Sequence, residues 1–93
     1  MRVTTKSGFK CDINEHITKD WRLTRAISAA QSTEDVNVRL KAACDMVQLI
    51  LGDEEEAFYK HLESVSPEHI VSEEAVTDDL MSIISKIKKV KNS

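Results

Sequence analysis

Histidine and cysteine are two residue types that often bind a metal ion or act as nucleophiles, and their spacing in this sequence favours neither role. The three histidines are His16, His61 and His69. The last two lack the i,i+4 spacing that places two imidazole rings on one helical face. No Cys-x-x-Cys motif is present, since Cys11 and Cys44 are far apart. The sequence therefore predicts no metal site.

Motifs for hydrolysis and nucleotide binding are also missing from the sequence. It contains no Gly-x-Ser-x-Gly elbow, no Walker loop and no glycine-rich dinucleotide motif, because its only glycines are Gly8 and Gly52. Carboxylates are abundant at residues 54–56 and at Asp78 and Asp79. Adjacent carboxylates point to different sides of a helix, so we interpret them as solvated faces and first-turn acids. No catalytic residue and no cofactor is predicted, and we expect the protein not to be an enzyme.

The formal net charge of −3 disfavours nucleic-acid binding, because the chain as a whole does not attract phosphates. A helix-turn-helix would place the helix after Gly52 against DNA, yet residues 53–56 at its start are all acidic. The basic residues gather near the C-terminus, where cations also stabilise the carbonyl end of a helix, at Lys86, Lys88, Lys89 and Lys91. We therefore expect no nucleic-acid partner.

The distribution of apolar residues indicates where the protein is located and whether its two cysteines are reduced. No apolar run approaches the roughly 20 residues that a membrane-spanning helix needs. The N-terminus shows no signal-peptide pattern, so we expect no membrane partner and a protein that stays where it is made. Cys11 and Cys44 each fall on an apolar position and are predicted to be small buried side chains in a reducing cytosol. A disulfide between them is the less favoured alternative.

Residues 1–13 show the alternation of apolar and polar side chains that is typical of half-buried strands. A short turn with Gly8 at positive φ would join two antiparallel strands. A lone hairpin is marginal in water, so this one must pack on helices through Val3, Phe9 and Ile13.

A first helix is predicted to begin at Asn14 or Thr18, both good N-caps, and to run to about Ala30. Trp21 is the only tryptophan. We expect it on the inner face of this helix as the largest single contribution to the core, since such a side chain buries about 150–250 Å². The alternative is an exposed Trp21 that forms a hot spot for a partner.

The longest amphipathic pattern spans Val36–Leu62 and is interrupted at Gly52. Before Gly52, apolar residues recur at steps of three and four, which predicts one helix with an inner face of Val36, Leu40, Ala43, Cys44, Val47, Ile50 and Leu51. Gly52 is predicted to end this helix, and Asp53 and Glu56 to form the capping box of the next. The next helix would turn Ala57, Phe58, Leu62 and Val65 towards the core.

The C-terminal part opens with two helix-start signals. Ser66-Pro67-Glu68 predicts a short helical turn, and Ser72-Glu73-Glu74 predicts a second cap. The helix that follows carries a continuous apolar face of Val76, Leu80, Ile83, Ile84, Ile87 and Val90. We therefore predict a mainly α (α+β) single domain over residues 1–93: a β-hairpin at 1–13 packed on a compact bundle of about four to five helices at 14–90, and a tail at 91–93.

Taken in order, these pieces resemble the small tail assembly chaperones of long-tailed bacteriophages (siphophages) and prophages. The resemblance is carried by the hairpin Thr4–Ile13, the helix opening Lys19-Asp20-Trp21, the helix end Leu49-Ile50-Leu51-Gly52, the acidic restart, and the Pro67 segment before the last helix. It covers nearly the whole chain.

The resemblance implies a non-enzymatic, α-rich protein that coats the tape measure protein and keeps it soluble. Such chaperones help the tail tube protein to polymerise around the tape measure protein and are then displaced. It implies the host bacterial cytoplasm, absence from the mature virion, and a longer form made by ribosomal frameshifting. Self-association is an open alternative. The family has no catalytic residues to carry over.

A chaperone for a long amphipathic helix needs an apolar groove or helix face that binds without reading a specific sequence. The candidate partner-binding residues lie at the end of the central helix and along the C-terminal helix: Val47, Ile50, Leu51, Leu80, Ile83, Ile84 and Ile87. The alternative for both faces is that they are simply core. The alternative for the whole protein is a small cytosolic helical adaptor or DNA-associated regulator.

Overall fold

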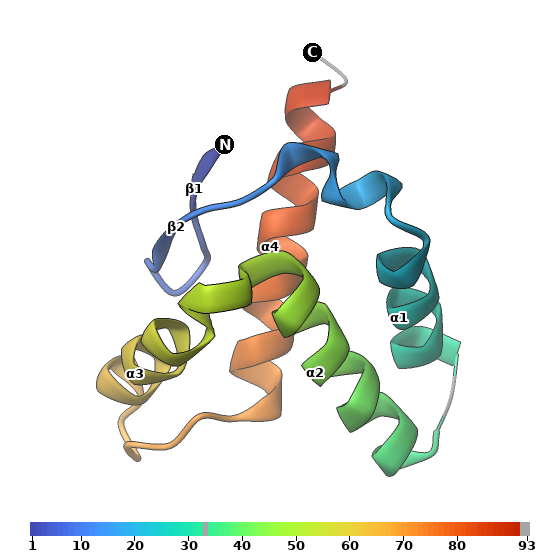
Figure 1. The fold of residues 1–93 in the computed structure, drawn as a ribbon. Helices are drawn as coiled ribbons and strands as arrows, with labels where there is room; N and C mark the ends of the chain where they lie inside the picture. The colour runs from blue at the N-terminus through green and yellow to red at the C-terminus, as the bar shows by residue number, and fades with distance from the viewer. Residues whose placement is uncertain (33, 92–93) are drawn as a thin grey trace.

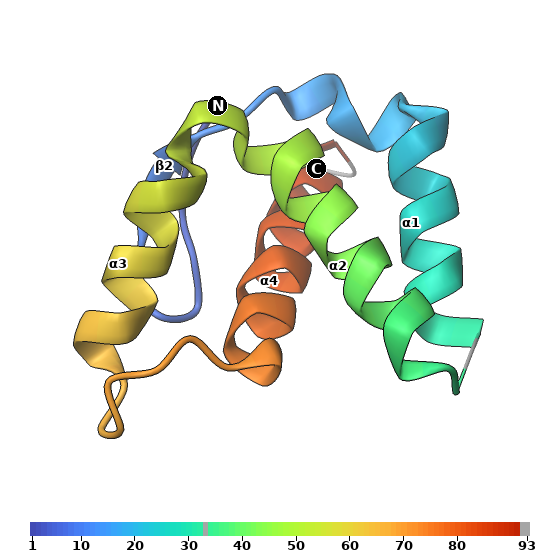
Figure 2. The same cartoon turned by 60° about the horizontal axis from the view of Figure 1, so that its bottom comes forward.

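The computed structural model describes residues 1–32 and 34–91, with side chains placed as far as Lys88. Its elements in chain order are β1 (Arg2–Thr4), β2 (Lys10–Asp12), the 3-10 helix η1 (Glu15–Lys19), α1 (Trp21–Ser32), α2 (Val36–Leu51), the 3-10 helix η2 (Gly52–Glu54), α3 (Glu55–Val65) and α4 (Glu73–Lys91). Helix α4 runs through the middle of the molecule, with the hairpin and α3 to one side and α1 to the other (Figures 1 and 2). The prediction of a mostly helical protein with an N-terminal β-hairpin is confirmed.

The hairpin forms as the alternating pattern predicts. Strands β1 and β2 pair antiparallel, with Val3 opposite Cys11, and both of these side chains are buried. Gly8 takes a φ of 94° in the turn, where a residue with a Cβ would be strained. The amide of Gly8 donates to the carbonyl of Thr5 at 2.9 Å, which closes the turn.

The first helix is divided at Asp20, which separates η1 from α1. Asn14 caps η1 as predicted, and its side chain accepts a hydrogen bond from the His16 amide at 2.9 Å. Asp20 has extended backbone angles, and its carboxylate accepts from the Arg22 amide at 2.9 Å. The prediction that Trp21 is a core residue is wrong: it is the first residue of α1 and its side chain is 72% exposed. The break at Asp20 turns Leu23 and Ala26 inward instead.

Gly52 ends the central helix as predicted: α2 stops at Leu51, and Gly52 is its C-cap with a positive φ of 53°. Its amide still bonds to the Gln48 carbonyl, and η2 leads directly into α3. The predicted Asp53 cap is absent, because Asp53 lies inside the 3-10 turn. In the described part of the chain α2, η2 and α3 follow one another without a gap, so the α-helices form three continuous helical stretches, 21–32, 36–65 and 73–91, and not four to five separate ones. In α3, Phe58 and Leu62 are buried as predicted. Ala57 and Val65 were also predicted to face the core, but both are exposed.

Helix α2 is rotated from the predicted orientation about its own axis. Its inner face consists of Ala42, Met46, Val47, Ile50 and Leu51. Val36, Leu40 and Cys44 were expected on that face and are exposed, so these three predictions are wrong. The buried positions 42, 46 and 50 repeat every four residues and include Met46, which the predicted face omitted.

Helix α4 supplies the centre of the core. Ser72 caps it as predicted, accepting from the Ala75 amide at 3.1 Å. At Pro67 the chain forms a hydrogen-bonded turn, in which the His69 amide donates to the Ser66 carbonyl at 3.1 Å, but not the predicted turn of helix, and His69 adopts a positive φ of 56°. The predicted apolar face from Val76 to Ile87 is buried, and it belongs to a single hydrophobic cluster with side chains from the hairpin and the other helices. The side chains of Lys89, Val90 and Lys91, and the remaining tail residues, lie outside the described part.

None of the helices in the described part of the chain combines the length and the apolar character that crossing a membrane requires.

Candidate functional site

The seven predicted partner-binding residues are brought together, but in the core. None is more than 5% exposed: Val47, Ile50, Leu51, Leu80, Ile83, Ile84 and Ile87. The alternative that both apolar faces are core is therefore the one that the structure supports, and a surface made of these residues is not available in this fold. Val47 also contributes to a groove that opens to the outside, and Ile84 contributes to a smaller hollow.

The surface instead carries other large apolar side chains, of which only Trp21 had been considered, from the sequence, as an exposed contact for a partner. They are Trp21, Val36, Val38, Leu40, Val65, Ile70, Val71 and Met81. Single exposed apolar residues are ordinary, so only those that gather around a concave surface carry an argument.

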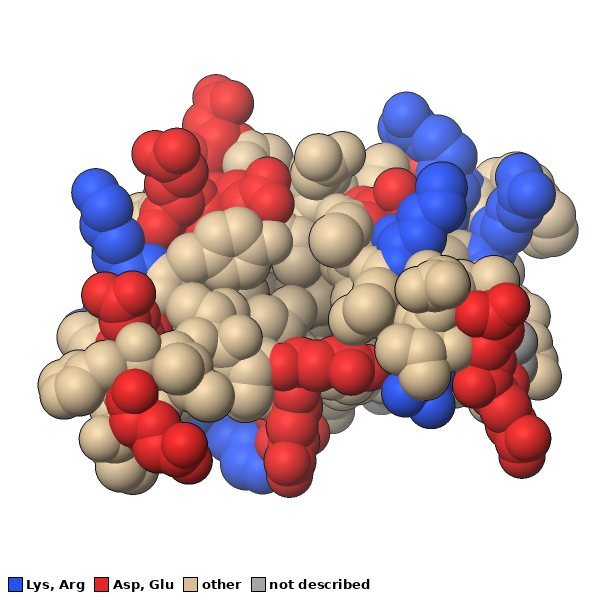
Figure 3. All heavy atoms as spheres, turned by 90° about the horizontal axis from the view of Figure 1, so that it is seen from below, with Lys and Arg blue, Asp and Glu red and all other residues tan. Residues whose placement is uncertain are grey.

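One such surface lies between α2, α3 and the start of α4, and we call it the α2–α3 groove. It has a volume of about 250 Å³ and is lined by Leu40, Ala43, Cys44, Val47, Tyr59, Val71, Ser72, Glu73 and Val76. Figure 3 shows a hollow of uncharged side chains between α3 and α2 on this face. Leu40 and Val71 are its exposed large apolar residues, while Val47 and Val76 belong to the core beneath. The groove is thus an apolar surface continuous with the protein interior.

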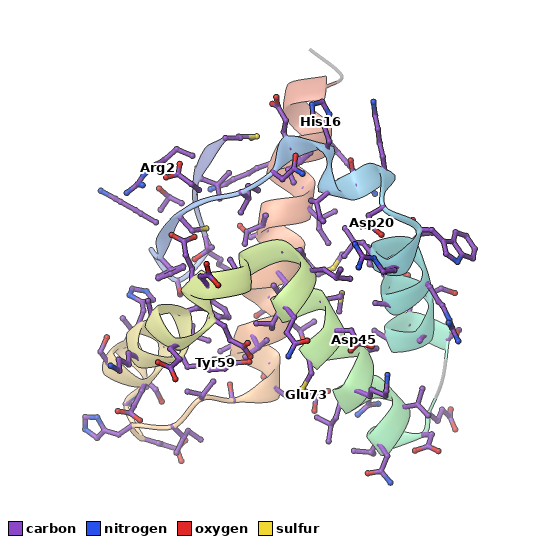
Figure 4. All side chains as sticks on the ribbon, in the orientation of Figure 1. Arg2, His16, Asp20, Asp45, Tyr59 and Glu73 are labelled. Atoms are coloured by element: carbon purple, nitrogen blue, oxygen red, sulfur yellow. The ribbon has the colours of Figure 1, made fainter. Side chains whose placement is uncertain are left out.

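Polar groups at the edge of the groove are mostly acidic. Tyr59 Oη donates a hydrogen bond to Glu55 at 2.7 Å. Burial, and then this bond to a carboxylate, raise the pKa of the Tyr59 phenol, so the phenol stays protonated and remains a donor. Glu73 forms an ion pair with Arg39 at 3.8 Å. Figure 4 shows Tyr59 and Glu73 on the α3 side of α2, and Asp45 on the side that faces α1.

A buried polar cluster, which the sequence pattern did not predict, ties the hairpin turn to α4. Asp79 was interpreted as part of a solvated face, but it is only 2% exposed. Its carboxylate accepts hydrogen bonds from Thr5 Oγ1 at 2.6 Å, from the Ser7 amide at 3.0 Å, and from Ser7 Oγ. Its position could have been inferred, since residue 79 falls between Val76 and Ile83 on the apolar face of α4.

This cluster contains Ser7, His61 and Asp79, yet it is not arranged as a catalytic triad. The His61 ring nitrogen lies 3.0 Å from the backbone carbonyl oxygen of Ser7, and not against its hydroxyl. Ser7 Oγ instead contacts the Asp79 carboxylate directly. A triad needs the base to contact the nucleophile and the acid to orient the base. The geometry here clamps a turn and does not activate a hydroxyl.

Metal-binding side chains are scattered over the described part of the chain, where no three of His, Cys, Asp or Glu come together in a group that could hold an ion. The two cysteines are free. Cys11 is fully buried, and this burial, with smaller contributions from Glu54 and Asp12, raises the pKa of its thiol to about 11. Cys44 is exposed in the α2–α3 groove, against the prediction that it is buried.

The lysines near the C-terminus do not form a shared surface in the described part. Lys86 Nζ donates to the backbone carbonyl of Thr4, which links α4 to β1. Lys88 lies beside Thr18 and Ile84 in a small hollow between η1, α1 and α4. The side chains of Lys89 and Lys91 lie outside the described residues.

Comparison of the chain with protein-family models, with curated proteins and with solved structures finds no match.

Proposed function

We propose that this protein is a tail assembly chaperone that binds amphipathic helical segments of the tape measure protein in the α2–α3 groove. The observation that carries the proposal is the open apolar groove itself, with Leu40, Cys44 and Val71 exposed at its surface. The resemblance of the whole chain to such chaperones supplies the identity of the partner.

A helix is the occupant that such a groove fits best. An amphipathic helix can place its apolar face in a hydrophobic groove through side chains spaced three and four residues apart. The exposed groove residues come from the flank of α2 and from the irregular segment before α4, so they present side chains and no free strand edge. Binding by strand addition is therefore disfavoured.

The charge at the edge of the groove favours a partner helix with basic residues. Glu73 lines the groove and is paired with Arg39, and Glu55 is bonded to the Tyr59 hydroxyl at its edge, so these groups together leave a negative charge. In Figure 3 a group of acidic side chains stands on the α3 side of this face. Opposite charges on a partner would speed its association and fix its orientation.

The size of the groove is suited to a reversible contact. At about 250 Å³ it is small beside the ligand sites of proteins, and few side chains would be immobilised in it. A modest affinity at each site, repeated by many copies along one long polypeptide, would keep that polypeptide soluble and still permit release.

The proposal is tested by co-expressing the protein with the tape measure protein of the same gene cluster and sizing the soluble fraction. We expect the tape measure protein to become soluble and to co-elute with many copies of this chain. Val71→Asp in the groove should abolish this effect. Val65→Asp is the matched control, because Val65 is also exposed but lies outside the groove.

Two results would count against the proposal. If the tape measure protein stays insoluble while this chain elutes alone, the adaptor alternative is favoured. If Val71→Asp and Val65→Asp solubilise as well as the unchanged protein, the partner binds elsewhere on the surface.

A further inference from the structure

A second and larger groove lies on the opposite flank of α2, where that helix packs against α1, and we call it the α1–α2 groove. It has a volume of about 450 Å³ and is lined by Trp21, Arg22, Arg25, Ala26, Ala29, Val38, Lys41, Ala42, Asp45 and Leu49. The α2 residues of the two grooves do not overlap. The proposed function therefore leaves this surface unassigned.

The α1–α2 groove combines an apolar floor with an exposed aromatic residue. Small side chains from both helices form much of the floor, so a partner's side chains can approach the backbone closely. Trp21 lines this groove with 72% of its surface exposed, and Val38 is a second exposed apolar residue in the lining. An exposed tryptophan beside a concave apolar surface is typical of a binding hot spot.

The charge of this groove is opposite to that of the whole chain. Arg22, Arg25 and Lys41 line it, with Asp45 as its one carboxylate, although the chain has a net charge of −3. On the face of the molecule that Figure 3 shows, most of the basic side chains lie on the α1 side. Lys41 is paired with Asp45 at 3.3 Å.

The two arginines of α1 differ in whether they have a carboxylate partner. Arg22 is held by Asp20, which accepts from its Nη2 at 2.7 Å and from its Nε at 3.1 Å. These bonds lower the pKa of the Asp20 carboxyl and keep the pair charged. In the described part of the chain, the Arg25 guanidinium makes no hydrogen bond or ion pair, and it is exposed. Arg25 is thus the cation that is free to bind a carboxylate of a partner.

We propose that the α1–α2 groove binds an acidic amphipathic helix of a partner protein. Trp21 and Val38 would cover its apolar face, and Arg25 would pair with its carboxylates through the two-pronged geometry that a guanidinium offers. The partner is distinct in chemistry from the basic helix expected in the α2–α3 groove, so the two grooves would bind different segments.

A peptide is favoured over a nucleic acid by the composition of the groove. Its floor offers methyl and methylene groups and only one unpaired cation, whereas nucleic-acid affinity comes mainly from several phosphate contacts. Arg22 and Lys41 already have carboxylate partners that a phosphate would have to displace.

The test uses three synthetic helical peptides of about 16 residues, close to four turns, that share one leucine and alanine face. Their polar positions carry glutamate, glutamine or lysine. Binding to the full chain is measured by anisotropy of the labelled peptide and by the emission of Trp21, which is the only tryptophan. A single-stranded oligonucleotide serves as the nucleic-acid probe.

We expect the glutamate peptide to bind most tightly and to shift the Trp21 emission to shorter wavelength. Arg25→Glu should weaken it by about tenfold or more, as loss and reversal of a close charge pair does. Lys60→Glu on α3 is the matched control: it makes the same charge change at an exposed site outside both grooves, and should leave this affinity nearly unchanged. Circular dichroism checks that both variants are folded.

The proposal is overturned if no peptide binds, if affinity does not depend on peptide charge, or if Arg25→Glu has no more effect than Lys60→Glu. If the oligonucleotide binds more tightly than the glutamate peptide, and Arg25→Glu abolishes this binding, the groove is a nucleic-acid site instead. Val71→Asp separates this proposal from the proposed function, because it should weaken the lysine peptide in the α2–α3 groove and not the glutamate peptide.

Discussion

Replacing Asp79 should destabilise the protein far more than replacing its neighbour Asp78. Asp79→Ala removes the acceptor of the buried donor Thr5 Oγ1 and of the partly buried Ser7 amide. A donor left unsatisfied in the interior costs about 1–3 kcal/mol, so the two together predict a loss of about 2–6 kcal/mol. That is a large part of the roughly 5–14 kcal/mol expected for a chain of this length.

Asp78→Ala is the matched control, because it removes a carboxylate from the adjacent position of the same helix. The side chain of Asp78 is 45% exposed and pairs with Lys6 at 3.4 Å. An exposed ion pair of this kind contributes about 0–1 kcal/mol. Asp79→Asn keeps the shape but replaces one acceptor oxygen with an amide donor, and should give an intermediate loss of about 1–3 kcal/mol.

The assay is urea unfolding followed by circular dichroism at equilibrium. Tryptophan emission is unsuitable for it, because Trp21 is already exposed in the folded protein. Native-state hydrogen exchange adds a local readout: the Ser7 amide should lose protection in Asp79→Ala. If Asp79→Ala and Asp78→Ala unfold at the same urea concentration, the reasoning about the buried cluster is refuted.

Three further predictions follow from which side chains are exposed and which are buried in the fold. Trp21→Ala should change stability by less than about 1 kcal/mol in urea unfolding, where a core tryptophan would cost about 3–5 kcal/mol. Leu40→Ala should likewise be nearly neutral in the same assay, whereas Leu80→Ala should cost about 2–5 kcal/mol; similar losses would mean that α2 is oriented differently. For Cys11, burial raises the thiol pKa from 9.0 to about 11, so its contribution to stability is complete below pH 9 and declines as the pH rises towards 11. A Cys11→Ala variant should lack this decline in the urea midpoint, and an identical pH profile for both proteins would contradict it.

Much of the fold could be predicted from periodicity and local signals. Alternation and Gly8 identified the hairpin, and Ser72 identified the start of α4, because these signals act through backbone geometry and nearby hydrogen bonds. Gly52 identified the end of α2, because a glycine at positive φ closes a helix at no side-chain cost. The 3-10 helix that joins α2 to α3 directly after Gly52 was not predicted.

The candidate site could not be predicted, because it depends on which flank of each helix meets a neighbour. A wide apolar face on α2 fits two rotations, and the sequence pattern favoured the one containing Leu40 and Cys44. Contacts with α1 and α4 select the other. The segment before α4 was predicted to hold a turn of helix, so the exposure of Ile70 and Val71 outside any helix could not be read from helical periodicity.

The reactivity of one thiol reports whether the α2–α3 groove is occupied. Cys44 is exposed in this groove, while Cys11 is buried with a raised pKa and should stay silent towards a thiol reagent. We predict that Cys44 reacts readily in the free protein and about tenfold or more slowly in the complex with the tape measure protein, which corresponds to ~1.4 kcal/mol of protection. If Cys44 reacts at the free rate in a complex that co-elutes intact, the groove is not where the partner binds.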